Sequence, residues 1–126
     1  MGIPQGLPPF SSELAIIKFG IILVISTYGT GLMMAFEWDD KKNTLNRQKH
    51  GIDFSTAIAV FDDPNRLEED STQPEHGEIR IRTIGMAGSS VLVLTVIYTD
   101  REQNKRIISA RCASKDERKR YMSFIN

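Results

Sequence analysis

Arginine, lysine, histidine and tyrosine supply most of the reactive side chains in this sequence. Arg80 and Arg82, and further on Arg106 and Arg111, lie in segments with the alternation of β-strands. Arginine suits phosphate because its planar fork donates two hydrogen bonds and keeps its charge. The imidazole of His50, with an unperturbed pKa of about 6.5, would donate or accept a proton near neutrality. The chemistry that these side chains could perform together is phosphate binding with proton transfer.

Other chemistries have weak support in the sequence. The stretch from Gly85 to Gly88 lacks the lysine and the following helix of a phosphate-binding loop, so we expect a hairpin turn there. His50 and His76 are far apart, and Cys112 has no neighbour at metal-ligand spacing. The carboxylates that begin at Asp62 could hold magnesium, but such a segment is more typical of a solvated loop or a partner contact. We therefore expect neither a metal nor a cofactor.

The charge distribution and the single cysteine narrow the class of protein. The chain of 126 residues has a formal net charge of zero. Acidic residues dominate from Asp62 to Glu78 and basic residues dominate from Arg101 onward, so a neutral total can hide a basic surface. Cys112 excludes an internal disulfide, which favours a reducing cytoplasm, and we interpret it as a small buried residue beside a strand.

The elements that must position the arginines begin with a strand and two helices. Residues 36–38 alternate apolar and acidic side chains, as a half-buried strand does. Asp39 or Asp40 can cap a helix over residues 41–50, which Gly51 ends and which Leu45 anchors in the core. Asp53 begins a second helix that ends at residues 62–64, Asp-Asp-Pro.

The second half predicts a strand meander and a terminal helix. From Glu78 the pattern alternates, with Arg80 and Arg82 on one face of a strand. Residues 91–98 are apolar at both odd and even positions, as in a central strand that is covered on both faces. Residues 106–111 make a third strand. Arg106 and Arg111 are five positions apart, so they share a face only if the strand has a bulge. The fold class is therefore α+β.

The last helix opens on a capping box and should pack on the sheet. Ser114 and Glu117 can satisfy each other's backbone amides at its start. We expect Tyr121, Met122 and Ile125 to point inward.

The N-terminal segment has three interpretations. Residues 14–25 form an apolar run interrupted by Lys18 and Gly20, which is shorter than the roughly 20 apolar residues of a membrane-spanning helix. Its cation lies inside the run, unlike that of a secretory signal. The run is an extra strand or helix, a weak anchor at a membrane surface, or translated sequence upstream of a natural start at Met33 or Met34.

Several separated motifs occur in a fixed order between Met34 and the C-terminus. They are Phe36-Glu37-Trp38-Asp39, Lys42-Asn43, Asn46, Lys49-His50-Gly51-Ile52, Phe54, Ala57, Val60-Phe61-Asp62-Asp63-Pro64, Gly77-Glu78, Arg80, Ile84-Gly85, Val96, Tyr98-Thr99, Arg106-Ile107-Ile108-Ser109-Ala110-Arg111, Ala113-Ser114, Glu117-Arg118 and Tyr121. Together they resemble the toxins of the BrnT family. Residues 1–33 lie outside the resemblance, which favours a misplaced start for them, and residues 34–126 form the toxin-like domain.

The resemblance implies a fold, an activity and a partner. The expected fold is RelE-like: a short N-terminal strand, two helices, an antiparallel meander and a C-terminal helix. The expected activity is metal-independent cleavage of RNA in the cytoplasm, which inhibits translation and growth. A BrnA-type antitoxin would neutralise the toxin and repress their shared operon, so the toxin would meet operator DNA only through the antitoxin. A toxin dimer within that complex is an open alternative, and no membrane partner is expected.

Metal-free RNA cleavage requires deprotonation of the 2′-hydroxyl, stabilisation of the phosphorane and protonation of the departing oxygen. The catalytic candidates are His50, Arg80, Arg111 and Tyr121, and the RNA-binding candidates are Lys49, Arg82, Tyr98 and Arg106. Arg80 leads because it matches a family arginine, and Arg111 is preferred to Arg106 for a second phosphate position. Their structural alternatives are an ion pair of Arg80 with Glu78 or Glu117, surface pairing of Arg111, a favourable helix end for His50, and packing of Tyr98 and Tyr121.

Two rival functions stay open at the level of the sequence. One is a module that binds RNA or DNA without cleaving it. The other is an antitoxin-dependent co-repressor that has lost toxicity, a hypothesis suggested by Ile79, where the family commonly has a charged residue.

Overall fold

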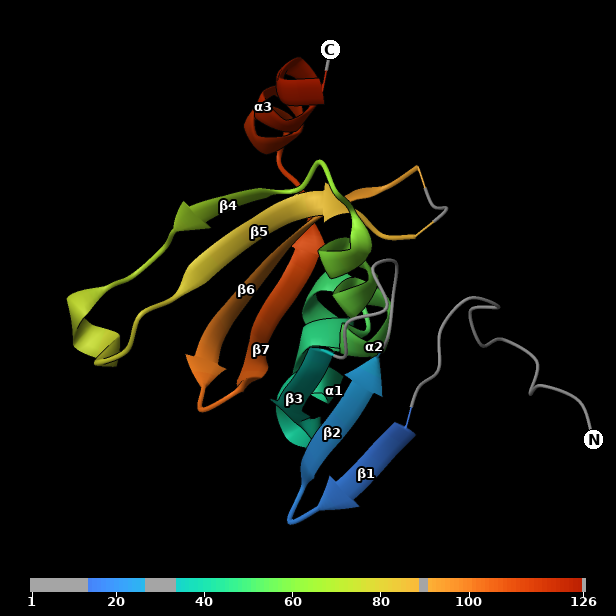
Figure 1. The fold of residues 1–126 in the computed structure, drawn as a ribbon, viewed down its shortest axis with the longest axis vertical. Helices are drawn as coiled ribbons and strands as arrows, with labels where there is room; N and C mark the ends of the chain where they lie inside the picture. The colour runs from blue at the N-terminus through green and yellow to red at the C-terminus, as the bar shows by residue number, and fades with distance from the viewer. Residues whose placement is uncertain (1–13, 27–33, 89–90, 126) are drawn as a thin grey trace, which may run out of the picture.

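The chain forms one mixed sheet with two helices packed on one face and the C-terminal helix at one end (Figure 1). The computed structural model describes residues 14–26, 34–88 and 91–125, with residues 14–18 and 26 described as backbone alone. Within these ranges the strands are β1 (Leu14–Lys18), β2 (Ile21–Ser26), β3 (Met34–Asp39), β4 (Leu67–Asp70), β5 (Ile81–Met86), β6 (Val93–Arg101) and β7 (Asn104–Cys112). The helices are α1 (Asp40–His50), α2 (Phe54–Ala57) and α3 (Lys115–Ile125), with 3₁₀ turns η1 (Ile58–Asp62) and η2 (Pro74–His76). The α+β class is confirmed.

The sheet order is β1-β2-β3-β7-β6-β5-β4. Strands β4 to β7 make the antiparallel meander, and β3 joins it through a short parallel pairing with β7. Helices α1 and α2 and the turn η1 pack on one face, around a core that includes Phe36, Phe54 and Ile107. A smaller apolar cluster under α3 lies at one end of the sheet and contains Ile84, Val93, Ala113 and Tyr121. In the described residues, no helix is both long and apolar enough to cross a membrane.

The apolar run near the N-terminus forms a β-hairpin. Strands β1 and β2 pair antiparallel, and β2 continues the sheet on β3. The amide of Asp40 donates to the carbonyl of Gly20 at 2.8 Å, which ties the hairpin turn to the start of α1. Residues 1–13 and 27–33, including the suggested start at Met33, lie outside the described residues. The suggested start remains a prediction.

Helix α1 begins and ends as the sequence predicts, but its anchor is different. The carboxylate of Asp39 accepts from the amide of Lys41 at 3.0 Å, and Gly51 ends the helix with a φ of 74°. Leu45 is 63% exposed, so its expected role in the core is wrong. Asn43 and Asn46 are buried instead. The Asn46 amide group donates to the carbonyl of Ala110 at 2.8 Å and accepts from the amide of Ala110 at 3.1 Å, so it continues the ladder at the edge of β7.

The second helix is short and continues as a 3₁₀ turn. Asp53 caps α2 by accepting from the amide of Ser55 at 3.0 Å, as expected. Residues 58–62 tighten into η1, and the chain leaves the helical conformation at Asp63, next to Pro64.

The boundaries of β5 and β6 differ from the prediction. Strand β5 begins at Ile81, and Ile79 is 69% exposed. Gly85 lies inside β5, not in the expected turn. The position requires a residue without a side chain because η1 and the following loop approach the strand there. A Cβ on Gly85 would lie 3.1 Å from Val60 Cγ1 and 3.0 Å from Asp63 Oδ2. Strand β6 begins at Val93, and Val91 is 86% exposed.

A bulge in β7 decides where the arginines point. The register with β6 passes from Ile97 opposite Ser109 to Tyr98 opposite Ile107, so Ile108 is the extra residue. Ile107 and Ala110 consequently both enter the helix-covered core, although they are three positions apart. The bulge therefore turns Arg106 and Arg111 to the same face, the one opposite α1 and α2.

Helix α3 has the predicted capping box but a narrower buried face. The amide of Ser114 donates to Glu117 Oε1 at 2.8 Å, and the amide of Glu117 donates to Ser114 Oγ at 3.1 Å. Tyr121 is 1% exposed, whereas Met122 is 40% and Ile125 is 37% exposed, so the inward position expected for the last two is wrong. Cys112 is exposed, which corrects its expected burial.

Candidate nucleic-acid interface

Four arginines gather on the sheet face that α1 and α2 leave open. Arg82 pairs across β5–β6 with Ile97, and on β7 Arg111 and Arg106 lie opposite Thr95 and Thr99 of β6. Arg80 directly precedes β5 and lies two positions before Arg82, so the alternation of the strand, continued back to Arg80, predicts the same side for its side chain. We call Arg80, Arg82, Arg106 and Arg111 the arginine face.

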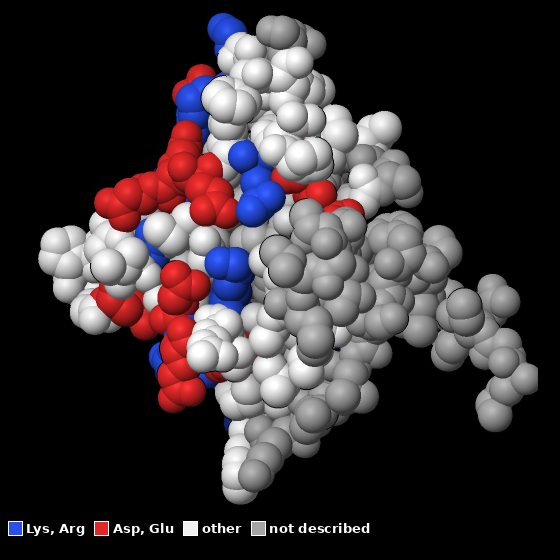
Figure 2. Space-filling view, in the orientation of Figure 1, with Lys and Arg blue, Asp and Glu red and all other residues white. Residues whose placement is uncertain are grey.

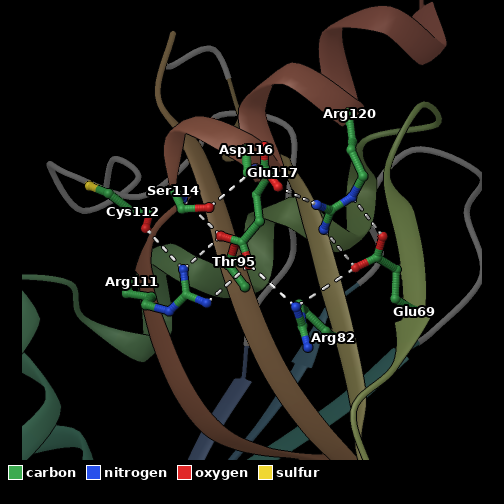
Figure 3. Close-up of polar contacts among 9 residues, drawn as sticks. All are labelled: Glu69, Arg82, Thr95, Arg111, Cys112, Ser114, Asp116, Glu117 and Arg120. Carbon is green, nitrogen blue, oxygen red and sulfur yellow. Dashed lines mark hydrogen bonds and ion pairs between the residues drawn. The ribbon is translucent and has the colours of Figure 1, made fainter.

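Glu117 of α3 is the centre of one end of the arginine face (Figure 3). Its carboxylate accepts a bidentate pair from Arg111, with Nη1 at 2.7 Å and Nη2 at 3.0 Å. The hydroxyl of Thr95 donates to the same carboxylate at 2.9 Å, and Arg82 Nη1 lies 3.6 Å from it. Glu117 is only 4% exposed. The capping box fixes its backbone, so a side chain of α3 orients arginines from β5 and β7.

The contacts of Glu117 explain its acidity. Chiefly its hydrogen bond from Arg111, helped by those from Ser114 and Thr95, lowers the pKa of Glu117 to about 2, against the opposing effect of burial. The same hydrogen bond raises the pKa of Arg111 above its ordinary value. At neutral pH, Glu117 is therefore a carboxylate held by its partners and is a poor proton donor.

The rest of the arginine face is also matched by carboxylates. Arg106 Nη1 lies 3.0 Å from Glu37 of β3, and Arg80 lies 3.1 Å from Glu78. Figure 2 shows the result on the surface: blue side chains occupy the middle of this face, and red side chains flank them. The expected basic surface is thus a row of guanidinium groups with a carboxylate beside each one.

The structure places the other candidate residues away from this row. Lys49 and His50 belong to the last turn of α1, in the helical layer behind the sheet, where Lys49 is exposed and His50 is half-buried. Tyr98 is 3% exposed in the helix-covered core, where its ring packs edge-on against Phe61 with centroids 5.3 Å apart. Burial, followed by the nearby charge of Glu68, raises the pKa of Tyr98 to about 12.

Tyr121 fastens α3 to the loop after η1. Its hydroxyl donates to Asp63 Oδ2 at 2.5 Å, and the same oxygen accepts from the amide of Met86 at 2.9 Å. Burial, helped by the bond to Asp63, raises the pKa of Tyr121 to about 12. Asp63 and Tyr121 also line a cavity of about 410 Å³ with Ala59, Met86 and Ile125. These contacts give Tyr121 a packing role and do not bring it to the arginines.

This arrangement is suited to holding anions. Two strands, β5 and β7, and the residue before β5 present guanidinium groups to one surface, where they can bind phosphate oxygens and stabilise added negative charge. Among the described residues, no cluster of three or more histidine, cysteine or carboxylate side chains could hold a metal ion.

Sequence reasoning found the arginines and Glu78, the partner of Arg80, but missed the residues that hold the other arginines. Glu117 appeared only as a capping-box residue and as one alternative partner of Arg80. The sequence feature that could have indicated its role is its position three residues after Ser114, close to the strand that carries Arg111. Glu69 and Arg120, which pair across β4 and α3, carried no signal because they are 51 positions apart.

Comparison with protein families matches residues 38–117 to the family described as ribonuclease toxin, BrnT, of type II toxin–antitoxin system. A search of curated proteins found no match. The matched residues begin inside β3 and end at Glu117, so they include every member of the arginine face and exclude the β1–β2 hairpin.

Proposed function

The chain belongs to the BrnT family of ribonuclease toxins of type II toxin–antitoxin systems, and on this premise we propose that its arginine face binds and cleaves RNA without a metal ion. The fold is RelE-like in this proposal, with the open sheet face as the site of cleavage. The cleavage inhibits translation and growth in the cytoplasm.

The observation that carries this proposal is the bulge at Ile108. It turns Arg106 and Arg111 toward the side on which Arg80 and Arg82 lie. Arg80 and Arg111 would bind the scissile phosphate and stabilise the charge of the phosphorane, and Arg82 and Arg106 would bind neighbouring phosphates. Rigid strands that hold these donors in place before the reaction would lower the cost of organising them during it.

Proton transfer is assigned separately from charge stabilisation. The arginines stay protonated, and Glu117 is committed to Arg111, so neither is a good base. His50, the candidate base from the sequence, lies in the helical layer on the other side of the sheet, out of reach of an RNA bound to the arginine face, so we assign it no proton transfer there. We therefore expect His50→Gln to keep the wild-type pH profile of cleavage between about pH 5 and 8.

An antitoxin partner follows from the family. We propose that it is of the BrnA type, that it neutralises the toxin, and that operator DNA contacts the complex through it. A toxin dimer within the complex is part of the same proposal. Capture of the co-expressed antitoxin, followed by measurement of the mass of the complex, tests both statements.

Incubation of the purified chain with a long RNA in the presence of EDTA tests the main proposal. We expect cleavage, and we expect its loss in Arg80→Ala with the fold retained. RNA that stays intact but is bound would favour a binding module. Induction in a bacterial host without the antitoxin separates a toxin, which arrests growth, from a co-repressor that has lost toxicity.

A further inference from the structure

Arg120 of α3 lies beside the arginine face and is bound by a carboxylate from β4, the edge strand next to β5. Its Nε donates to Glu69 Oε2 at 3.1 Å, and its Nη2 donates to Glu69 Oε1 at 3.0 Å. This two-pronged geometry is the one in which a guanidinium group binds phosphate. Arg120 is 41% exposed and Glu69 is 32% exposed at their side chains, so solvent and ligands reach the pair.

Arg82 lies on the other side of the same carboxylate. Its Nη1 is 3.9 Å from Glu69 Oε1 and 3.6 Å from Glu117 Oε2. Both separations exceed a hydrogen bond, and within the described residues the buried Nε of Arg82 has no hydrogen-bond partner. Arg82 is thus a loosely held cation between two carboxylates.

The charges form one continuous chain across the end of the sheet (Figure 3). From α3 to β7 it runs Arg120, Glu69, Arg82, Glu117 and Arg111. Glu117 is buried and bound by four groups, whereas Glu69 is accessible and held by side-chain ion pairs. Exposed ion pairs are individually weak, so an incoming anion can exchange with Glu69 more readily than with Glu117.

We propose that Arg120 and Arg82 form a second phosphate-binding site for RNA, in which the Glu69 carboxylate stands in for a phosphate until RNA replaces it. This inference rests on the proposed function of the arginine face and extends it to α3. Glu69 lowers the affinity for RNA by competing for the two guanidinium groups.

The chain supplies a matched control for the competing carboxylate. Glu68 is the neighbouring residue of β4 and lies opposite Thr83, on the helix-covered side, whereas Glu69 lies opposite Arg82. Glu68→Gln therefore makes the same change in net charge without touching the proposed site. For Arg120, the control is Arg118→Gln, an exposed residue two positions away on the same helix and so on a different face.

The test measures binding of a single-stranded RNA that is 2′-O-methylated at every position and so cannot be cleaved. We expect Glu69→Gln to bind it about 3-fold to 5-fold more tightly than Glu68→Gln does, which is the scale of one exposed ion pair. The slope of log affinity against log salt should steepen by about 0.7 for each additional phosphate that the protein binds. Arg120→Gln should weaken binding more than Arg118→Gln does and should cancel the effect of Glu69→Gln in the double variant.

Cleavage of unmodified RNA by the same proteins separates the two proposals. Equal affinities of Glu69→Gln and Glu68→Gln in proteins that still cleave RNA would overturn the Arg120–Arg82 site and leave the proposed function intact. Failure of every variant and of the wild type to bind or cleave would overturn both. All the substituted residues have accessible side chains, and thermal unfolding checks that each variant folds.

Discussion

At the scale of single residues, the arginine face depends on the exact geometry of Arg111. Arg111 makes a bidentate pair with Glu117, which fixes the orientation of its guanidinium group. In our proposal, the guanidinium group binds the RNA phosphate in this orientation. Lysine keeps the charge near Glu117 but has a single nitrogen and no fork. Alanine is a poorer probe, because it would leave a buried carboxylate without its main partner and destabilise the fold.

We therefore expect Arg111→Lys to lower the rate of RNA cleavage by about 100-fold, the usual effect of losing one donor to a transition-state charge. Arg118→Lys, a conservative change at an exposed position of α3, is the control and should leave the rate unchanged. The measurement is single-turnover cleavage of a labelled RNA, with thermal unfolding to check the fold. A wild-type rate in Arg111→Lys would show that the fork geometry has no part in catalysis.

Glu117 gives a second prediction, in the pH dependence of stability. Its pKa in the folded protein is about 2, below the ordinary value of 4.5, so the deprotonated form stabilises the fold. This contribution is complete above about pH 4.5 and is lost as the pH falls toward 2. Allowing for the exposure of Arg111, it amounts to about 2 kcal/mol of unfolding free energy.

Urea unfolding between pH 6 and pH 2 measures this contribution. Glu117→Gln should be less stable than the wild type at pH 6 and should show a flatter decline on acidification. Asp116→Asn removes the neighbouring carboxylate, whose side chain is 89% exposed, and its curve should run parallel to that of the wild type. If Glu117→Gln also runs parallel, the buried carboxylate does not stabilise the fold in this way.

At the scale of elements, the features that depend on contacts within a few residues were predicted correctly, and those that depend on contacts between distant residues were not. Asp39, Gly51, Asp53 and the Ser114–Glu117 box begin or end helices through contacts within a few residues, so sequence patterns reveal them. The bulge at Ile108 has no such signal, because it is the pairing with β6 that sets it. The alternation of side chains along a regular strand therefore predicted opposite faces for Arg106 and Arg111.

In helix α1, the apolar residue expected to hold the helix on the sheet is not the residue that does so. Leu45 was the expected anchor and is exposed, whereas the Asn46 side chain completes the hydrogen bonds of Ala110 at the β7 edge. An amide group can donate and accept at once, so it can replace a missing neighbouring strand. No hydrophobic pattern contains this information.

The contrast between these two residues is testable. We expect Asn46→Ala to lower the free energy of unfolding by about 2 to 4 kcal/mol, since it leaves the buried amide and carbonyl of Ala110 without partners. Leu45→Ala should change it by less than about 0.5 kcal/mol. Urea unfolding of both variants decides the matter, and equal losses would mean that α1 is held by apolar contacts after all.

At the scale of the whole molecule, the neutral net charge reflects pairing, not separation, of charges. The acidic segment and the basic segments are distinct in sequence, which predicted a basic surface. In the fold, β4 lies beside β5, so Glu69 comes opposite Arg82. The α+β class and the family could be predicted because they depend on many independent motifs. The charge network could not be predicted because it depends on which strands become neighbours.

The central claim is that the arginine face cleaves RNA, and the most direct test is cleavage in EDTA by the wild type, Arg80→Ala and Arg47→Ala. Arg47 is an exposed arginine of α1, on the opposite face of the sheet, and is the matched control. We predict that the wild type and Arg47→Ala cleave the RNA and that folded Arg80→Ala does not. Equal cleavage by Arg80→Ala and Arg47→Ala, or cleavage that EDTA abolishes, would contradict the claim.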